Sequence, residues 1–147
     1  MFGLKTNLAY HFTETWGLVM AQYGQKLEVT KDGREFATLA EYPNPDVRAG
    51  SSGCLVAVDD NQLFLAGGGL PSPSNRAFMF NKRFKGGWTE LPRMETGRYG
   101  HSCGVAKVGR STKIVVAGGR NALRGHFLNS VEIFSPQSGS WRQGKYF

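Results

Sequence analysis

The side chains that could do chemistry are few and widely spaced. The histidines (His11, His101, His126) and the cysteines (Cys54, Cys103) do not have the spacing of a zinc site. No segment fits H-E-x-x-H or G-x-S-x-G. We therefore predict no catalytic residue, no metal site and no cofactor. We expect His101 to hydrogen-bond backbone groups near a turn.

Two glycine pairs could also do chemistry, because glycine-rich loops can cradle phosphate. Gly67 and Gly68 end "QLFLAGG", and Gly118 and Gly119 end "KIVVAGG". Neither following segment fits G-x-x-x-x-G-K-[ST] or G-x-G-x-x-G, and neither precedes a helical pattern. We interpret both pairs as structural, at points where a buried strand ends and the backbone needs positive φ or close approach.

The glycine pairs belong to a longer internal repeat. Matching features lie about 50 residues apart and keep one order over about 100 residues, and such a period is typical of repeat architectures. Arg48 is matched by Arg98, Gly67 and Gly68 by Gly118 and Gly119, and Trp88 by Trp141.

Each repeat is predicted to contain four short strands. In the second copy these are "CGVAKV", "KIVVAGG", "SVEIFS" and a segment beginning at Trp141. The second segment is a continuous apolar run, as in a strand buried on both faces, and "SPQSG" is a turn. No segment shows a convincing helical period, so the chain is predicted to be all-β.

A degenerate copy precedes these two. "QKLEVTKDGREFATLAEYP" resembles "NSVEIFSPQSGSWRQGKYF". Leu27 and Val29 then match Val131 and Ile133, and Phe36 takes the place of Trp88. This copy lacks the glycine pair and the tryptophan. Its second strand is expected in "WGLVMAQYG", and its first in the first dozen residues.

A glycine pair after an apolar strand, an aromatic strand, and a tryptophan seven or eight residues later form a recognisable pattern. The spacings from Phe80 to Trp88 and from Phe134 to Trp141 fit it. The pattern resembles the kelch repeat, whose period is about 50 residues. The resemblance implies blades of a β-propeller, each with four antiparallel strands.

The resemblance also implies a partial propeller. Its units would be a degenerate blade over 1–44 and kelch blades over 45–95 and 96–147. A propeller typically needs four to eight blades. We expect a fragment of a longer propeller, or an arc completed by further blades or chains.

In kelch propellers, the loops between second and third strands share a rim with the loops that enter the first strands. For Arg48 and Arg98, contact with a ligand and buttressing of the blade through backbone carbonyls stay equally open. Solvated loop charge is the alternative for the others, although arginine suits carboxylates. The residues that the resemblance places on this rim, and that we predict to bind a partner, are Arg48, Arg76, Arg98, Arg120, Asn121, Arg124 and His126.

The net charge of +7 favours acidic partners. It does not indicate nucleic acid, because the basic residues are dispersed with no run of five or more. Trp88 and Trp141 are predicted to pack between blades; a base-stacking role has no interleaved basic and aromatic stripe to support it. No stretch approaches 18 apolar residues, so we predict no membrane span.

The two cysteines lie on first strands of neighbouring repeats, at nearly matching positions. Buried free thiols are the favoured interpretation, and a disulfide requires Cα atoms within about 7 Å. Two cysteines form no disulfide framework. This and the absence of a signal-peptide pattern favour a cytoplasmic setting. An extracellular setting is the alternative if the N-terminus is missing.

These features favour a non-enzymatic protein-interaction module whose basic rim binds an acidic peptide or loop. Kelch resemblance suggests two settings, a substrate adaptor or a cytoskeletal scaffold. One alternative is a fragment of a secreted copper enzyme of the galactose-oxidase type, which would need Tyr and His ligands and a Cys cross-linked to Tyr. Another is a truncated arc without function.

Overall fold

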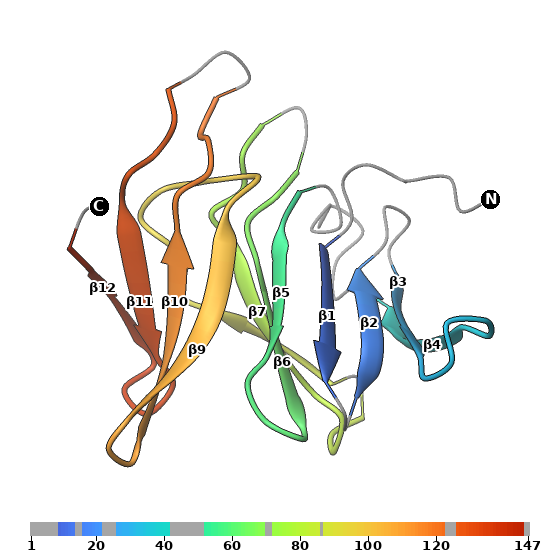
Figure 1. Ribbon diagram of the computed structural model, residues 1–147. Coiled ribbons are helices and arrows are strands. Elements are labelled where there is room, and N and C mark those ends of the chain that lie inside the picture. Colours follow the sequence, from blue (N-terminus) through green and yellow to red (C-terminus); the bar gives the residue numbers. More distant parts are fainter. Residues whose placement is uncertain are drawn as a thin grey trace.

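A computed structural model of the chain describes residues 9–13, 16–21, 26–41, 52–69, 72–85, 87–122 and 126–145. The regular secondary structure within these ranges consists of β-strands, which form three four-stranded antiparallel sheets (Figure 1). The prediction of an all-β chain built from four-stranded antiparallel units is confirmed. No helix in these ranges could cross a membrane.

In every sheet the strands follow one another in chain order, and each strand pairs with the next. The first sheet corresponds to the degenerate copy, and its β3–β4 pairing shifts register between Leu27 and Glu28. Its strands are β1 (Ala9–Thr13), β2 (Gly17–Ala21), β3 (Lys26–Thr30) and β4 (Ala37–Glu41).

The second and third sheets correspond to the two clear repeats. The second contains β5 (Cys54–Ala57), β6 (Gln62–Ala66), β7 (Ala77–Asn81) and β8 (Trp88–Leu91). The third contains β9 (Ser102–Val108), β10 (Ser111–Ala117), β11 (Val131–Ser135) and β12 (Ser140–Gln143). The predicted unit boundary after residue 44 lies outside the described residues, and the one after residue 95 stays a prediction.

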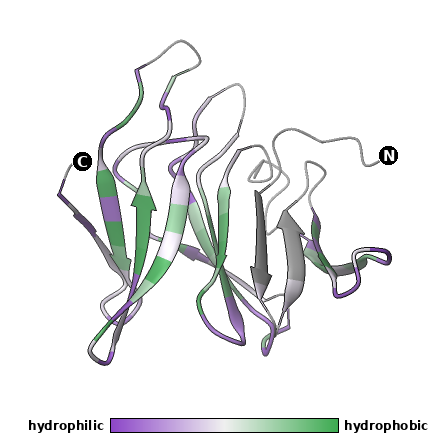
Figure 2. Cartoon of the chain, viewed as in Figure 1, coloured by the Kyte–Doolittle hydropathy of each residue, from purple (hydrophilic) through white to green (hydrophobic). Residues whose placement is uncertain are grey.

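The core lies between the sheets, in two layers. Strand β6 contributes to both, because successive side chains of a strand point to opposite faces. Leu63 and Leu65 pack toward the first sheet, whereas Phe64 packs toward the third, and all three are fully buried. This two-sided burial is the reason for the continuous apolar run in β6. Apolar colouring marks strands of the second and third sheets in Figure 2, and polar colouring marks their turns.

The first strands of the three sheets lie side by side: β1 contacts β5, and β5 contacts β9 (Figure 1). The sheets therefore form an arc with β1, β5 and β9 along one side. The chain leaves β6 and β10 through loops that end at the same rim, and these loops carry several of the predicted binding residues.

Candidate functional site

The glycine pairs build the base of the rim. Gly67 and Gly68 have φ of 66° and 82°, and Gly118 and Gly119 have φ of 71° and 85°. A Cβ atom on Gly67 would lie 2.6 Å from the Arg98 carbonyl oxygen and would also collide with the His101 ring. All four positions require glycine for its backbone conformation, and Gly67 and Gly119 require it also for close packing.

Arg98 lies under the rim and is completely buried. Its Nη1 donates to the carbonyl oxygens of Gly118 (2.9 Å) and Ser130 (3.2 Å). Its Nη2 donates to Ser130 Oγ (3.1 Å) and Glu132 Oε2 (2.6 Å). Of the two predicted roles, this geometry is that of a buttress. Because no part of Arg98 is exposed, it cannot contact a partner at the surface of this structure. We therefore remove Arg98 from the residues predicted to bind a partner.

Glu132 completes the buried network. Besides Arg98, it accepts hydrogen bonds from the backbone amides of Glu95 (2.6 Å) and Thr96 (3.3 Å). The carboxylate thus joins β11 to the connection between the second and third sheets. A buried charge is tolerated only when it is paired and hydrogen-bonded, and both conditions are met here.

His101 lies at the same junction, 8% exposed. Its Nε2 donates to the Ala66 carbonyl oxygen (3.0 Å), as expected for a histidine near a turn, and its buried Nδ1 has no hydrogen-bond partner among the described residues. Burial first, and the neighbouring charge of Arg98 second, lower the pKa of His101 from 6.5 to about 4. His101 is therefore neutral at physiological pH.

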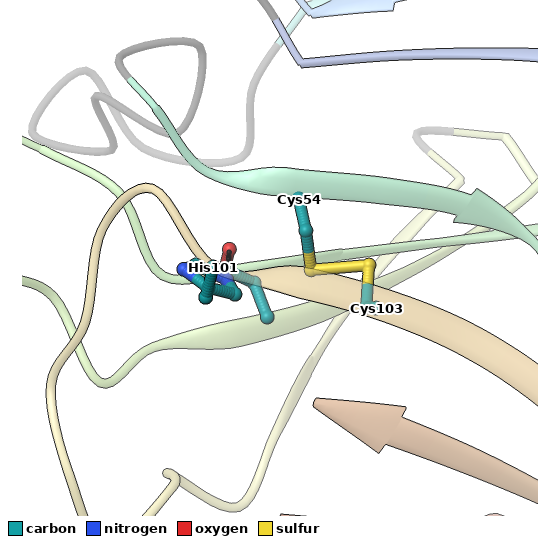
Figure 3. The surroundings of a disulfide bond; sticks show 4 residues. Cys54, His101 and Cys103 are labelled. Atoms are coloured by element: carbon teal, nitrogen blue, oxygen red, sulfur yellow. Dashed lines mark hydrogen bonds between the residues drawn. A yellow bond between two sulfur atoms is a disulfide. The ribbon is translucent and has the colours of Figure 1, made fainter. Parts of the chain in front are cut away.

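Cys54 and Cys103 form a disulfide between β5 and β9 (Figure 3). Their Cα atoms are 5.9 Å apart, inside the range that the bond requires. The pairing answers a question that the sequence left open, and it differs from the favoured interpretation of free thiols. Disulfides persist mainly in oxidising compartments, so this bond argues against the reduced setting that the cysteine count favoured.

Tryptophan side chains connect each sheet to its neighbour. Trp88 Nε1 donates to the Glu41 carbonyl oxygen and Trp141 Nε1 to the Pro92 carbonyl oxygen, both at 2.6 Å. The Trp141 ring also packs against Phe64 of the second sheet, with centroids 6.2 Å apart. Both residues therefore contact the preceding sheet.

The β10–β11 loop carries the most exposed part of the rim. Phe127 is 76% exposed, and the Arg120 guanidinium lies 4.2 Å from the centroid of its ring. The backbone of Arg120 pairs with Tyr99 on one side and Phe127 on the other. The Tyr99 hydroxyl donates to the Ala122 carbonyl oxygen (3.0 Å). These bonds hold both ends of the loop.

The other predicted rim residues differ in their surroundings. Arg76 forms a two-pronged ion pair with Glu90 (2.9 and 3.0 Å), which lowers the pKa of that carboxyl. Asn121 and His126 are exposed on the β10–β11 loop beside Arg120. Arg48 and Arg124 lie outside the described residues.

Phe127 was not predicted from the sequence. The available signal was a large aromatic residue in a segment otherwise rich in small and basic residues, "GGRNALRGHFLNS". Its exposure depends on the tertiary structure, since an aromatic residue is usually buried.

Comparison with known proteins supports this architecture. The family model for the Kelch motif matches residues 98–146. Residues 98–146 form a kelch repeat. This repeat contains the Arg98 buttress, the second glycine pair and Trp141. The comparison with curated proteins found no match.

Solved structures extend the likeness to nearly the whole arc. The structure of YjhT is similar over 97% of this chain and 50% of its own, with a TM-score of 0.75 and 14% identity. A fungal alcohol oxidase of the AA5 family, in complex with copper, is similar over 97% of this chain and 31% of its own, with a TM-score of 0.70 and 19% identity. At these identities the likeness shows the fold alone. This chain spans half the length of the first structure and less than a third of the second.

Proposed function

We propose that this chain is a non-enzymatic protein-interaction module whose β10–β11 loop binds an acidic segment of a partner protein. The observation that carries the proposal is the exposed Phe127 with Arg120 stacked on its ring. Propeller folds of the kelch type often mediate protein interaction, and loops on a rigid scaffold commonly carry function.

The composition of the loop favours an acidic partner. Residues 118–130 include Arg120, Arg124 and His126 but no aspartate or glutamate. A guanidinium fork suits a carboxylate, and an aromatic side chain supplies the apolar anchor typical of an interface hot spot. The matching segment of the partner would contain Asp or Glu next to an apolar residue.

The geometry of the loop base supports specific recognition. The Leu128 amide donates to the Gly119 carbonyl oxygen (2.8 Å), and the Arg120 amide donates to the Tyr99 carbonyl oxygen (2.9 Å). Since these bonds fix the backbone on either side, Arg120 and Phe127 lose less freedom on binding. The broader settings, as substrate adaptor or cytoskeletal scaffold, remain part of this proposal.

Selection of peptides from a random display library tests the proposal. Peptides that bind the wild-type chain should be enriched in Asp and Glu. The double variant R120A/F127A should weaken their binding by about 30-fold or more, the effect of losing an interface hot spot. R83A, on the exposed turn after β7, is the matched control. Selected peptides without acidic enrichment, or equal binding by R120A/F127A, would contradict the proposal.

The copper-enzyme alternative has one observation in its favour, the likeness to an alcohol oxidase solved with copper. Both cysteines are in a disulfide, so neither is free for the cross-link to tyrosine. Among the described residues no group of three His, Cys, Asp or Glu side chains could hold a metal ion, a search that does not include tyrosine. Metal analysis of the purified protein tests this alternative; stoichiometric copper would overturn the interaction proposal.

A further inference from the structure

The hairpin turns on the side of the sheets opposite the rim carry exposed apolar side chains. The β5–β6, β7–β8 and β9–β10 turns lie on this side, at the bottom of Figure 1. Phe84, on the β7–β8 turn, is 68% exposed, and Val108, beside the β9–β10 turn, is 63% exposed. We call the two segments that contain them, residues 82–85 and 107–110, the turn face.

Basic side chains surround both apolar ones. The two segments contain no aspartate or glutamate. Their basic side chains are all exposed: Lys82, Arg83, Lys85, Lys107 and Arg110. The β5–β6 turn carries Asp59 and Asp60 on the same side, and the β3–β4 turn carries two acidic and two basic residues. Among the described residues of these turns, basic side chains therefore outnumber acidic ones.

The β7–β8 turn holds Phe84 in place through its own backbone. The Arg83 amide donates to Asn81 Oδ1 (3.0 Å), and the Phe84 amide donates to the Asn81 carbonyl oxygen (3.2 Å). The Lys82 amide donates to the carbonyl oxygen of Asn61, on the β5–β6 turn (3.0 Å). These bonds fix the turn to its neighbour, so Phe84 is presented to solvent by an ordered hairpin.

We propose that the turn face binds the surface of a membrane that contains anionic lipids. Lys and Arg side chains near such a surface are attracted to the negative headgroups. An apolar side chain beside them can enter the boundary between headgroups and acyl chains. Phe84 and Val108 lie on separate turns, and a flat, fluid lipid surface can accept both without a shaped pocket for either.

The turn face is separate from the site of the proposed function. Arg120 and Phe127 lie on the β10–β11 loop, at the rim, and the turn face lies on the opposite side of the sheets (Figure 1). A chain bound to lipid through the turn face would keep its rim open to a partner. The two proposals are independent, because lipid binding requires no peptide at the rim.

Cosedimentation with lipid vesicles tests the proposal on the 147-residue chain. The chain should bind vesicles that contain phosphatidylserine and should not bind vesicles of phosphatidylcholine alone. Added salt should weaken binding, because the Debye length falls from about 10 Å at 0.1 M to about 3 Å at 1 M. R83A/F84A removes a charge and an apolar side chain from the turn face and should weaken binding about 10-fold or more.

R120A/F127A is the matched control, because it removes the same two residue types from the rim. The net charge of +7 attracts the whole chain to any anionic surface, and both double variants reduce that attraction equally. Only R83A/F84A should lose most of the vesicle binding, and circular dichroism checks that both variants keep their β-structure. A wild type that does not bind phosphatidylserine vesicles, equal binding to phosphatidylcholine vesicles, or equal weakening by the two variants would each overturn the proposal.

Discussion

At the scale of single residues, two arginines of the same repeat have opposite roles. Arg98 is completely buried and its guanidinium donates to backbone carbonyls and Glu132, whereas the Arg120 guanidinium lies on an exposed phenylalanine ring. Both follow a glycine in the sequence. The difference depends on which acceptors the fold brings near each side chain.

Replacement of Arg98 by alanine should be strongly destabilising. It would leave the Glu132 carboxylate buried without its counter-ion, and breaking a buried ion pair costs about 3–5 kcal/mol of unfolding free energy. Urea denaturation at neutral pH measures this loss. R93A, at an exposed position, is the control. A loss below about 1 kcal/mol for R98A would contradict the buttress role.

His101 should make stability depend on pH. Its pKa is about 4 in the folded chain and 6.5 when exposed, so between these values the unfolded chain binds a proton that the folded chain does not. Stability is then fully present above pH 6.5 and is lost as pH falls toward 4. The loss between pH 7 and pH 5 should be about 2 kcal/mol.

Urea denaturation at the two pH values, for wild type and H101Q, isolates this contribution. Glutamine can still donate to the Ala66 carbonyl oxygen but does not titrate. The difference between pH 7 and pH 5 should therefore shrink by about 2 kcal/mol in H101Q. An unchanged difference would show that other groups cause the pH dependence.

At the scale of elements, the sheets are joined at their first and fourth strands. The disulfide joins β5 to β9, Trp88 of β8 hydrogen-bonds Glu41 of β4, and Trp141 of β12 hydrogen-bonds Pro92, one residue after β8. Between these connections lie the apolar layers around Phe64 and Leu63. Adjacent sheets are therefore expected to unfold together.

Removal of the disulfide should lower stability substantially. The bond closes a loop with a sequence separation of 49 residues, for which the chain-entropy model gives about 4 kcal/mol. The C54A/C103A double variant should show this loss in urea denaturation, and reduction of the wild type with dithiothreitol should reproduce it. The reductant should leave the double variant unchanged. Equal stability of oxidised and reduced wild type would contradict this role of the bond.

At the scale of the whole molecule, three sheets of the same topology follow one another along the chain, with β1, β5 and β9 side by side. Two apolar layers lie between the sheets, and strand β6 contributes to both. The described sheets are therefore expected to unfold in one cooperative transition. The truncated, non-functional arc considered from the sequence would show no such transition.

Urea denaturation followed by far-UV circular dichroism and by tryptophan fluorescence measures this cooperativity. The two signals should change together, because Trp88 and Trp141 each hydrogen-bond a carbonyl oxygen of the segment before their own sheet. Transitions that separate, or a wild type without a cooperative transition, would instead support the truncated arc.

Much of the fold could be predicted because it depends on patterns of residues that lie close together in the sequence. The apolar run ending at Gly67 predicts a strand buried on two faces, and the interval from Trp88 to Trp141 predicts repeated sheets. These patterns can be recognised in the sequence because, in every sheet, each strand pairs with the next strand along the chain. The degenerate copy was recognisable from Leu27 and Val29, which lie on β3.

The sequence by itself determined the all-β class, the repeat and the positions that must be glycine, since each depends on residues close together in the chain. Only the tertiary structure decided that Cys54 pairs with Cys103, that Arg98 is buried and that Phe127 is exposed. Each of these depends on contacts or cover across the fold: the cysteines are 49 residues apart, and Glu132 lies 34 residues from Arg98. Such distances between segments are set when the sheets pack, and no local pattern encodes them.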